Sequence, residues 1–152
     1  MNFVYSYNKV EVAGQRQVSG IQPVSDATVE DIENNYPNNR FVLSANTVFS
    51  DQWNLLLRAN YYGTHYDERG TIGAATNPSK EIDAVVYVDA ELTYQYSENT
   101  AIKFGLMNMF DEYIDEIDAP FANRQSVGLQ YPRRSAANYE GGSWHLGVTH
   151  QF

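Results

Sequence analysis

The last eleven residues of the chain, Gly142 to Phe152, restrict its fold more than any other stretch. Taken in twos from the end, they form a mostly apolar set, Phe152, His150, Val148, Leu146 and Trp144, and a polar or small set, Gln151, Thr149, Gly147, His145 and Ser143. Side chains of a β-strand alternate between two faces, so the segment is predicted to be a strand with one apolar and one polar face. Its length matches the roughly 9–11 residues of a tilted transmembrane β-strand. Soluble domains seldom end on a large aromatic residue, because termini fray in water. The segment therefore indicates the closing strand of a bacterial outer-membrane barrel.

Five upstream stretches show a similar strand-like alternation. They are residues 1–12, 40–49, 53–61, 85–96 and 102–110. Together with the terminal segment they predict six antiparallel strands. Between residues 24 and 32 a short helix is expected, capped at Ser25.

The connections between these strands alternate in length. Two are short and polar, Ser50–Gln52 and Ser97–Thr100, and predict tight hairpins. Three are long and polar, at about residues 13–39, 63–81 and 111–141. Every short link falls on the side of the carboxyl terminus. Outer-membrane barrels have this asymmetry, with short periplasmic turns and long outer loops.

The predicted fold class is all-β, an antiparallel up-and-down transmembrane β-barrel segment of about six strands. Six strands form an incomplete barrel here, so we expect the first and last strands to have unpaired edges. Hydrophobic residues make up 43% of the chain and its mean hydropathy is −0.49, and no apolar run approaches the ~20 residues of a spanning helix. Alternating strands average to neutral hydropathy, so these values are compatible with a membrane barrel.

The alternation predicts which side chains face the membrane. The expected band is Phe41, Leu43, Trp53, Leu55, Leu57, Val86, Val88, Leu92, Phe104, Leu106, Trp144, Leu146, Val148 and Phe152. The charged strand residues, Arg58, Asp89, Glu91 and Lys103, fall on the opposite, polar face. There they could line a ligand route or contact a plug, or form a solvated ladder of cross-strand pairs.

The third long connection carries the candidate binding residues. Tyr131, Arg133 and Arg134 are the ligand-binding candidates, because paired arginines can grip phosphate or carboxylate groups. The alternative is internal pairing of these arginines with Asp111 or Glu112. Five acidic residues precede them, Asp111, Glu112, Asp115, Glu116 and Asp118. Such a cluster could bind Ca²⁺ through its carboxylates, but it lacks the residue spacing of a calcium-binding loop. The alternative is a solvated loop that attracts cations without a defined site.

Several function classes receive no support from the sequence. The chain has no cysteine, which removes disulfides and thiol chemistry, and its net charge of −9 argues against nucleic acid as a partner. Gly141-Gly142-Ser143-Trp144-His145 misses the last position of the G-x-S-x-G nucleophile motif. The three histidines, His65, His145 and His150, lack metal-ligand spacing. We therefore expect no enzyme, no metal and no cofactor.

The start of the chain also bears on its origin. Met1 to Tyr5 runs directly into strand-like sequence, without the basic and apolar regions of a signal peptide. Secreted and outer-membrane proteins carry such a signal. We therefore expect the chain to be a fragment of a longer protein.

Three stretches resemble one family. Leu106 to Tyr113 is similar to the N-x-F-D-x-x run that ends the penultimate strand of TonB-dependent outer-membrane receptors. Gly128 to Ser135, followed by the strand ending at Phe152, resembles the family's closing segment, and Arg40 to Gly63 resembles one of its hairpins. His150 departs from the aromatic residue usual two positions before the terminal Phe.

That resemblance implies a function. Residues 1–152 would be the C-terminal part of a 22-stranded receptor barrel, without its plug domain, importing a nutrient such as an iron–siderophore complex with energy from TonB. The implied partners are outer-membrane lipid, the rest of the barrel and plug, TonB through the N-terminal part, the barrel-assembly machinery through the last strand, and a small-molecule nutrient. The alternative is a small soluble β-sheet or β-barrel protein that binds a ligand with its aromatic face.

Overall fold

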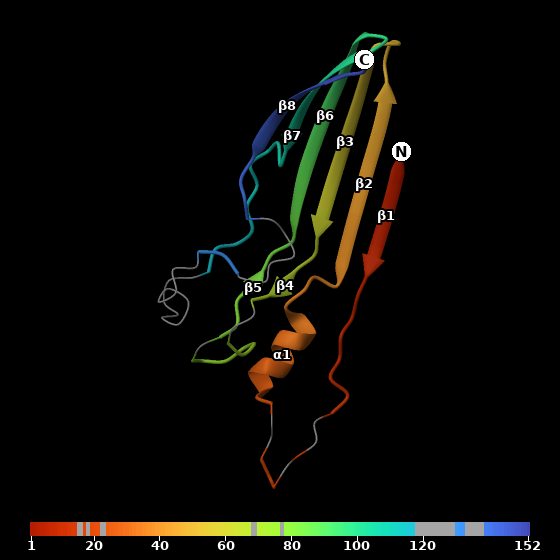
Figure 1. Cartoon of the computed structure of the whole chain (residues 1–152). Helices are drawn as coiled ribbons and strands as arrows, with labels where there is room; N and C mark the ends of the chain where they lie inside the picture. Colours follow the sequence, from red (N-terminus) through yellow and green to blue (C-terminus); the bar gives the residue numbers. More distant parts are fainter. Residues whose placement is uncertain are drawn as a thin grey trace.

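The computed structural model describes residues 1–14, 17, 19–21, 24–67, 70–76, 78–117, 130–132 and 139–152. Most of the regular structure is one six-stranded antiparallel sheet in which chain neighbours pair side by side (Figure 1). Its strands are β1 (Asn2–Tyr7), β2 (Asn39–Val48), β3 (Trp53–Tyr62), β6 (Val85–Ser97), β7 (Thr100–Met107) and β8 (Ser143–His150). A separate pair, β4 (His65–Tyr66) and β5 (Glu81–Ile82), and one helix, α1 (Asp26–Asn34), lie in the connections.

This topology confirms the predicted all-β class and the six antiparallel strands. The strand order is β1-β2-β3-β6-β7-β8, so β1 and β8 form the two edges and the sheet is not closed into a barrel. Within the described residues, neither edge strand pairs with anything on its outer side.

The two ends of the sheet differ strongly. The turns after β2 and β6 lie at one end together with the carboxyl terminus, and the long connections extend from the other (Figure 1). The first turn is closed by a hydrogen bond from the Phe49 amide to the Trp53 carbonyl at 3.0 Å, and Ser50 within it takes a positive φ of 69°. We call these ends the turn end and the loop end.

Two strands end three or more residues before the predicted position, and the other strand boundaries lie within two residues of the prediction. β1 stops at Tyr7 rather than near residue 12, because its partner β2 begins at Asn39, which pairs with Tyr7. β7 stops at Met107 rather than 110, because Asn108 adopts a positive φ of 48° and turns the chain out of the sheet. Strand length is thus set by where the partner begins and by local turn geometry.

The helix α1 was predicted from its cap. Ser25 is the N-cap residue, and its hydroxyl oxygen accepts the Thr28 amide at 3.3 Å. Two helix carboxylates hold the neighbouring loops: Glu33 accepts the Val12 amide at 2.7 Å and Glu30 accepts the Ile72 amide at 2.6 Å. The helix therefore ties the first long connection to the second.

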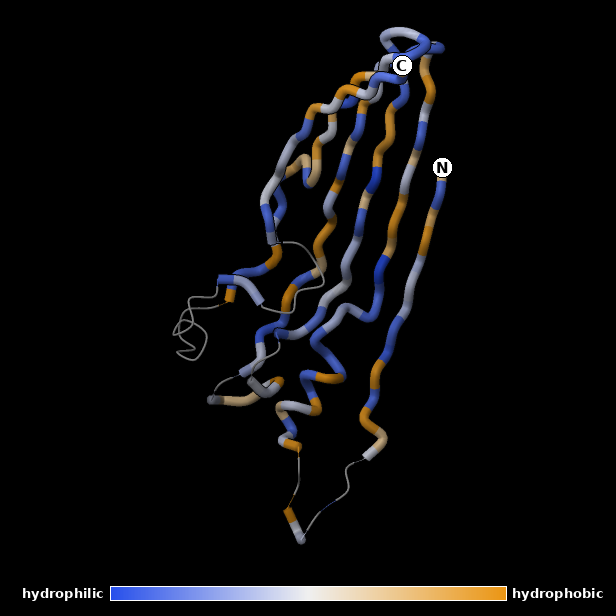
Figure 2. The backbone as a smooth tube through the Cα atoms, viewed as in Figure 1, coloured by the Kyte–Doolittle hydropathy of each residue, from blue (hydrophilic) through white to orange (hydrophobic). Residues whose placement is uncertain are grey.

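The six-stranded sheet is a single layer. Among the described elements, none packs against either of its faces, and hydropathy alternates along the strands (Figure 2). The buried hydrophobic side chains among the described residues, Ile82, Tyr87 and Ile114, form a small cluster at the loop end, with Tyr62, Val85 and Tyr131 against it. Among the described residues, no helix is long and apolar enough to cross a membrane.

Candidate functional site

The strand register gathers the apolar side chains on one face of the sheet. Thirteen residues predicted to meet the membrane lie in strands, and the pairing places all of them on this apolar face: Phe41, Leu43, Trp53, Leu55, Leu57, Val86, Val88, Leu92, Phe104, Leu106, Trp144, Leu146 and Val148. The fourteenth, Phe152, follows β8, and the centroid of its ring lies 4.7 Å from that of the His150 ring. On β8 this face is open, with Leu146 64% and Val148 66% exposed. Burying so much apolar surface requires lipid or a protein partner.

Aromatic rings gather toward both ends of the apolar face. At the turn end, the ring of Trp53 lies 4.5 Å from that of Tyr94. At the loop end, the ring of Phe41 lies 4.8 Å from that of Tyr5 and 5.1 Å from that of Tyr61. Tyr and Trp suit a boundary between apolar and aqueous surroundings, because each combines a large apolar ring with a polar atom.

The opposite face carries the charged strand residues, as the alternation predicted. Arg58 and Asp89 are directly opposed in the register of β3 and β6. The Asp89 carboxylate accepts the Asn60 side-chain amide at 3.1 Å and the Asn108 backbone amide at 3.0 Å. This polar face is mixed, however, because the register also places Leu56 on it, opposite Glu91.

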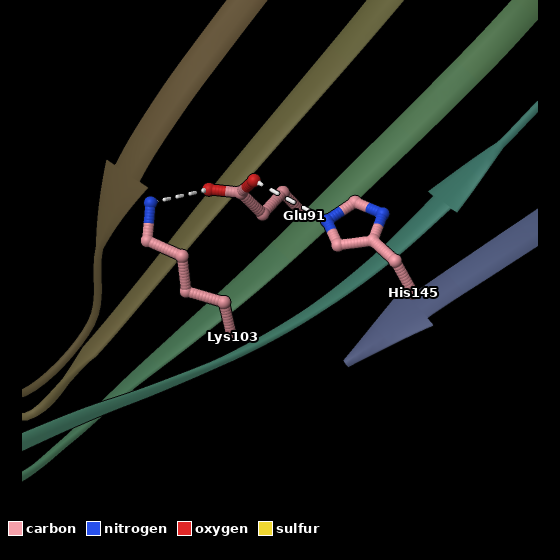
Figure 3. A network of polar contacts seen from close by, with 3 residues as sticks. All are labelled: Glu91, Lys103 and His145. Atoms are coloured by element: carbon pink, nitrogen blue, oxygen red, sulfur yellow. Dashed lines mark hydrogen bonds and ion pairs between the residues drawn. The ribbon is translucent and has the colours of Figure 1, made fainter. Parts of the chain in front are cut away.

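A cross-strand network joins three strands on the polar face (Figure 3). Glu91 of β6 accepts Lys103 of β7 at 3.3 Å, and its other oxygen lies 3.9 Å from Nε2 of His145 on β8. Gly105 separates Glu91 from His145 in the register, and a Cβ there would clash with the His145 ring. The glycine therefore leaves room for the imidazole to reach across β7.

The N-x-F-D run fastens β7 to β8. The Asn108 side chain donates to the Glu112 carbonyl at 2.8 Å and accepts the Glu112 amide at 3.0 Å. The Asp111 carboxylate accepts the Gly142 amide, immediately before β8, at 2.7 Å. Asn108 and Asp111 both have positive φ, which Asn and Asp tolerate better than most residues. At this turn the same two residues therefore tolerate the positive φ and supply the side-chain hydrogen bonds that hold the turn together.

Only one of the three predicted ligand-binding residues lies in the described part of the chain. Tyr131 packs against the buried cluster, and its ring stacks between those of Tyr113 and Tyr139. Arg133 and Arg134 lie outside the described residues, as does Asp118 of the acidic run. The ligand-binding prediction for these three residues therefore stays a prediction.

The described residues form several cavities at the loop end, and two of them have carboxylates in their lining away from the β7–β8 turn. One, of about 330 Å³, lies on the polar face, and its lining includes Asn60, Asp89 and Asn108. These three side chains already bond to one another or to the backbone, so they are committed to structure. The other, of about 280 Å³, lies between residues 83–86 and 112–115. No sequence signal predicted it, because its two walls are almost thirty residues apart.

The three histidines lie at three separate positions, His65 in β4 and the other two in β8. The His65 imidazole is buried in β4, and burial lowers its pKa. His145 joins the Glu91 network, while Nδ1 of His150 lies 2.9 Å from the Thr100 hydroxyl. Within the described ranges, no three His, Asp or Glu side chains converge in a way that could hold a metal ion.

Comparison with known proteins adds no assignment: no protein-family model, no curated protein and no solved structure matches the chain. Function must therefore be inferred from the residues and their arrangement.

Proposed function

We propose that the chain is the C-terminal portion of a TonB-dependent receptor barrel in the outer membrane of a Gram-negative bacterium. The observation that carries this proposal is the two-faced sheet, which is apolar on one side, polar on the other and uncovered by any described element. A soluble protein of this length would bury its apolar face against a second layer. In a lipid bilayer the hydrocarbon core takes the place of that layer.

The connections support the same proposal. Short turns at one end and long connections at the other are the arrangement of outer-membrane barrels. The open edges of β1 and β8 suit a sheet that continues into further strands. The N-x-F-D turn, on which the family resemblance depends, holds the start of the terminal strand through Asp111 and Gly142.

In this role the chain contributes to uptake of a small nutrient, such as an iron–siderophore complex. The rest of the barrel and the plug would complete the transport path, and TonB would supply energy through the N-terminal part. Lipid would contact the apolar face, and the barrel-assembly machinery would recognise the last strand. The loop end would face the cell exterior, where loops on a rigid scaffold carry ligand contacts.

Solution behaviour distinguishes this proposal from a small soluble ligand-binding protein. We expect the chain to aggregate in plain buffer and to be monodisperse, with β-rich circular dichroism, in detergent micelles, as measured by light scattering. Replacing Leu57, Leu146 and Val148 together by Thr should reduce the aggregation, because these side chains are exposed on the apolar face. A monodisperse, β-rich chain in plain buffer would contradict the membrane proposal and favour the soluble binder.

A further inference from the structure

The two outer strands of the sheet leave their backbone edges open. β1 and β8 are these strands, and among the described residues neither pairs with a strand on its outer side. Each open edge is a row of backbone N–H and C=O groups, which is a template for one more strand. In the hydrocarbon core of a bilayer no water can satisfy such groups, so they require a protein partner.

Neither edge carries the features by which proteins protect a free edge. Exposed edge strands are usually guarded by charged residues, by proline or by a β-bulge. β1 and β8 contain no Lys, Arg, Asp, Glu or Pro. Their pairing with β2 and β7 also runs without a register shift, whereas the interior pair β6–β7 has one between Gln95 and Ser97. Both edges are therefore suited to pairing with another strand.

The two edges also match each other. Strand direction alternates across the sheet, so β8 runs antiparallel to β1. The register places Phe3 and Tyr5 of β1 on the apolar face, together with Leu146 of β8. A second copy of the chain can therefore set its β1 beside β8 in antiparallel pairing, with the apolar and polar faces of the two sheets continuous.

A pairing of β8 with β8 of the second copy is the competing arrangement. It is also antiparallel, but it turns the second copy upside down, so the loop ends of the two copies point in opposite directions. Pairing of β8 with β1 keeps every loop end on one side, as in outer-membrane barrels. The choice between the two arrangements rests on the proposed membrane location.

We propose that β8 binds β1 of a second copy of the chain, so that copies join into one continuous antiparallel wall. Each copy contributes an even number of strands, six, so every added copy preserves the alternation of strand direction. A head-to-tail contact of this kind can close into a ring, which leaves no open edge. In the proposed receptor the further strands of the barrel take the same two edges, so self-pairing is a property of the chain on its own.

The mass of the assembly gives the first test. The unmodified chain in detergent micelles should have a protein mass of two or more times 17.3 kDa, measured by light scattering with the detergent contribution subtracted. A folded, β-rich monomer would overturn the proposal. If that monomer still needed detergent, self-pairing alone would fail and the membrane proposal would stand.

Cross-linking identifies the strands that meet. The chain has no cysteine, so Val4→Cys on β1 and Gly147→Cys on β8 would each supply a single thiol on the polar face. Both positions are accessible, because Val4 is 50% exposed and a Cβ on Gly147 meets nothing within 4 Å. Thr93→Cys is the matched control, because it lies on the same face but on β6, which has a paired strand on each side.

The cross-linking pattern separates the two arrangements. Treated with a short bis-maleimide, a mixture of Val4→Cys and Gly147→Cys chains should give at least about threefold more linked dimer than either variant alone, because a head-to-tail contact joins unlike edges. Mixtures of either variant with Thr93→Cys should show no such increase. Gly147→Cys chains that link among themselves as well as the mixture does would show that β8 pairs with β8, and would overturn the proposal.

Discussion

Replacing Leu57 by Arg should destabilise the sheet in a bilayer by about 2–4 kcal/mol, whereas Leu56→Arg should cost less than about 1 kcal/mol. The two leucines are neighbours on β3 but lie on opposite faces. Leu57 pairs with Ala90 on the apolar face, and Leu56 pairs with Glu91 on the polar face. An arginine at residue 56 therefore gains a carboxylate partner, while one at residue 57 would be surrounded by hydrocarbon.

The position of Leu57 sets the size of the effect. It lies midway between Trp53 and Tyr61, which carry the aromatic rings of β3 at the two ends of the apolar face. These two are eight residue steps apart, about 26 Å along the strand at roughly 3.3 Å per residue. With the roughly 40° tilt of barrel strands this is about 20 Å of height, which fits within the ~25 Å apolar band of outer-membrane barrels. Leu57 is therefore near the depth at which a charge costs most. The expected loss corresponds to about a 30- to 900-fold change in the ratio of folded to unfolded protein.

Urea titration in lipid vesicles, followed by tryptophan emission, measures this difference. The Leu57→Arg midpoint should fall clearly below that of the unmodified chain, and the Leu56→Arg midpoint should stay close to it, with similar slopes. Equal losses in the two variants, or a larger loss for Leu56→Arg, would refute the assignment of the faces.

Three further predictions concern the loop end. Asp111→Ala removes the acceptor of the Gly142 amide and should speed amide hydrogen exchange at the start of β8 about fivefold, the effect of losing roughly 1 kcal/mol, whereas Glu112→Ala should not. Burial lowers the pKa of His65, chiefly by desolvation and against the opposing charge of Asp115, so the unfolded imidazole takes up a proton more readily than the folded one. Stability of the β4–β5 pair should therefore fall as pH drops below about 6.5, seen as faster exchange at Ile82, and His65→Phe should abolish this dependence. If the chain belongs to a receptor as proposed, deleting residues 118–129 from the full-length protein should impair nutrient uptake in cells without reducing the amount of assembled barrel. Unchanged uptake would count against a binding role for this loop.

The strands were predictable because apolar and polar residues alternate along each of them, which shows which side chains share a face of the sheet. The period-two pattern fixed which of Leu55 and Asn54 would share a face with Leu92, and the register agrees. The cap at Ser25 was predictable for a similar reason, since its hydroxyl bonds an amide only three residues away. Both features depend on interactions between residues that are close in sequence or regularly spaced.

The loop end was not predictable in the same way. The stack of Tyr113, Tyr131 and Tyr139 depends on contacts across stretches that have no periodic pattern. The β4–β5 pair has only two residues in each strand, too few to show alternation. The role of Gly105 depends on His145, forty residues later, whose ring occupies the space that a side chain would fill. Such features follow from the completed sheet and not from local sequence.

Tryptophan quenching tests most directly whether lipid covers the apolar face. Trp53 and Trp144 are the two tryptophans of the chain, and both lie on that face, on different strands. In vesicles made from lipids brominated on their acyl chains, we expect strong quenching of both and weak quenching by aqueous iodide, with Trp53→Phe and Trp144→Phe separating the two signals. Strong quenching of both tryptophans by iodide, with none by the brominated lipid, would show that water or protein covers this face and that the chain is not a barrel segment.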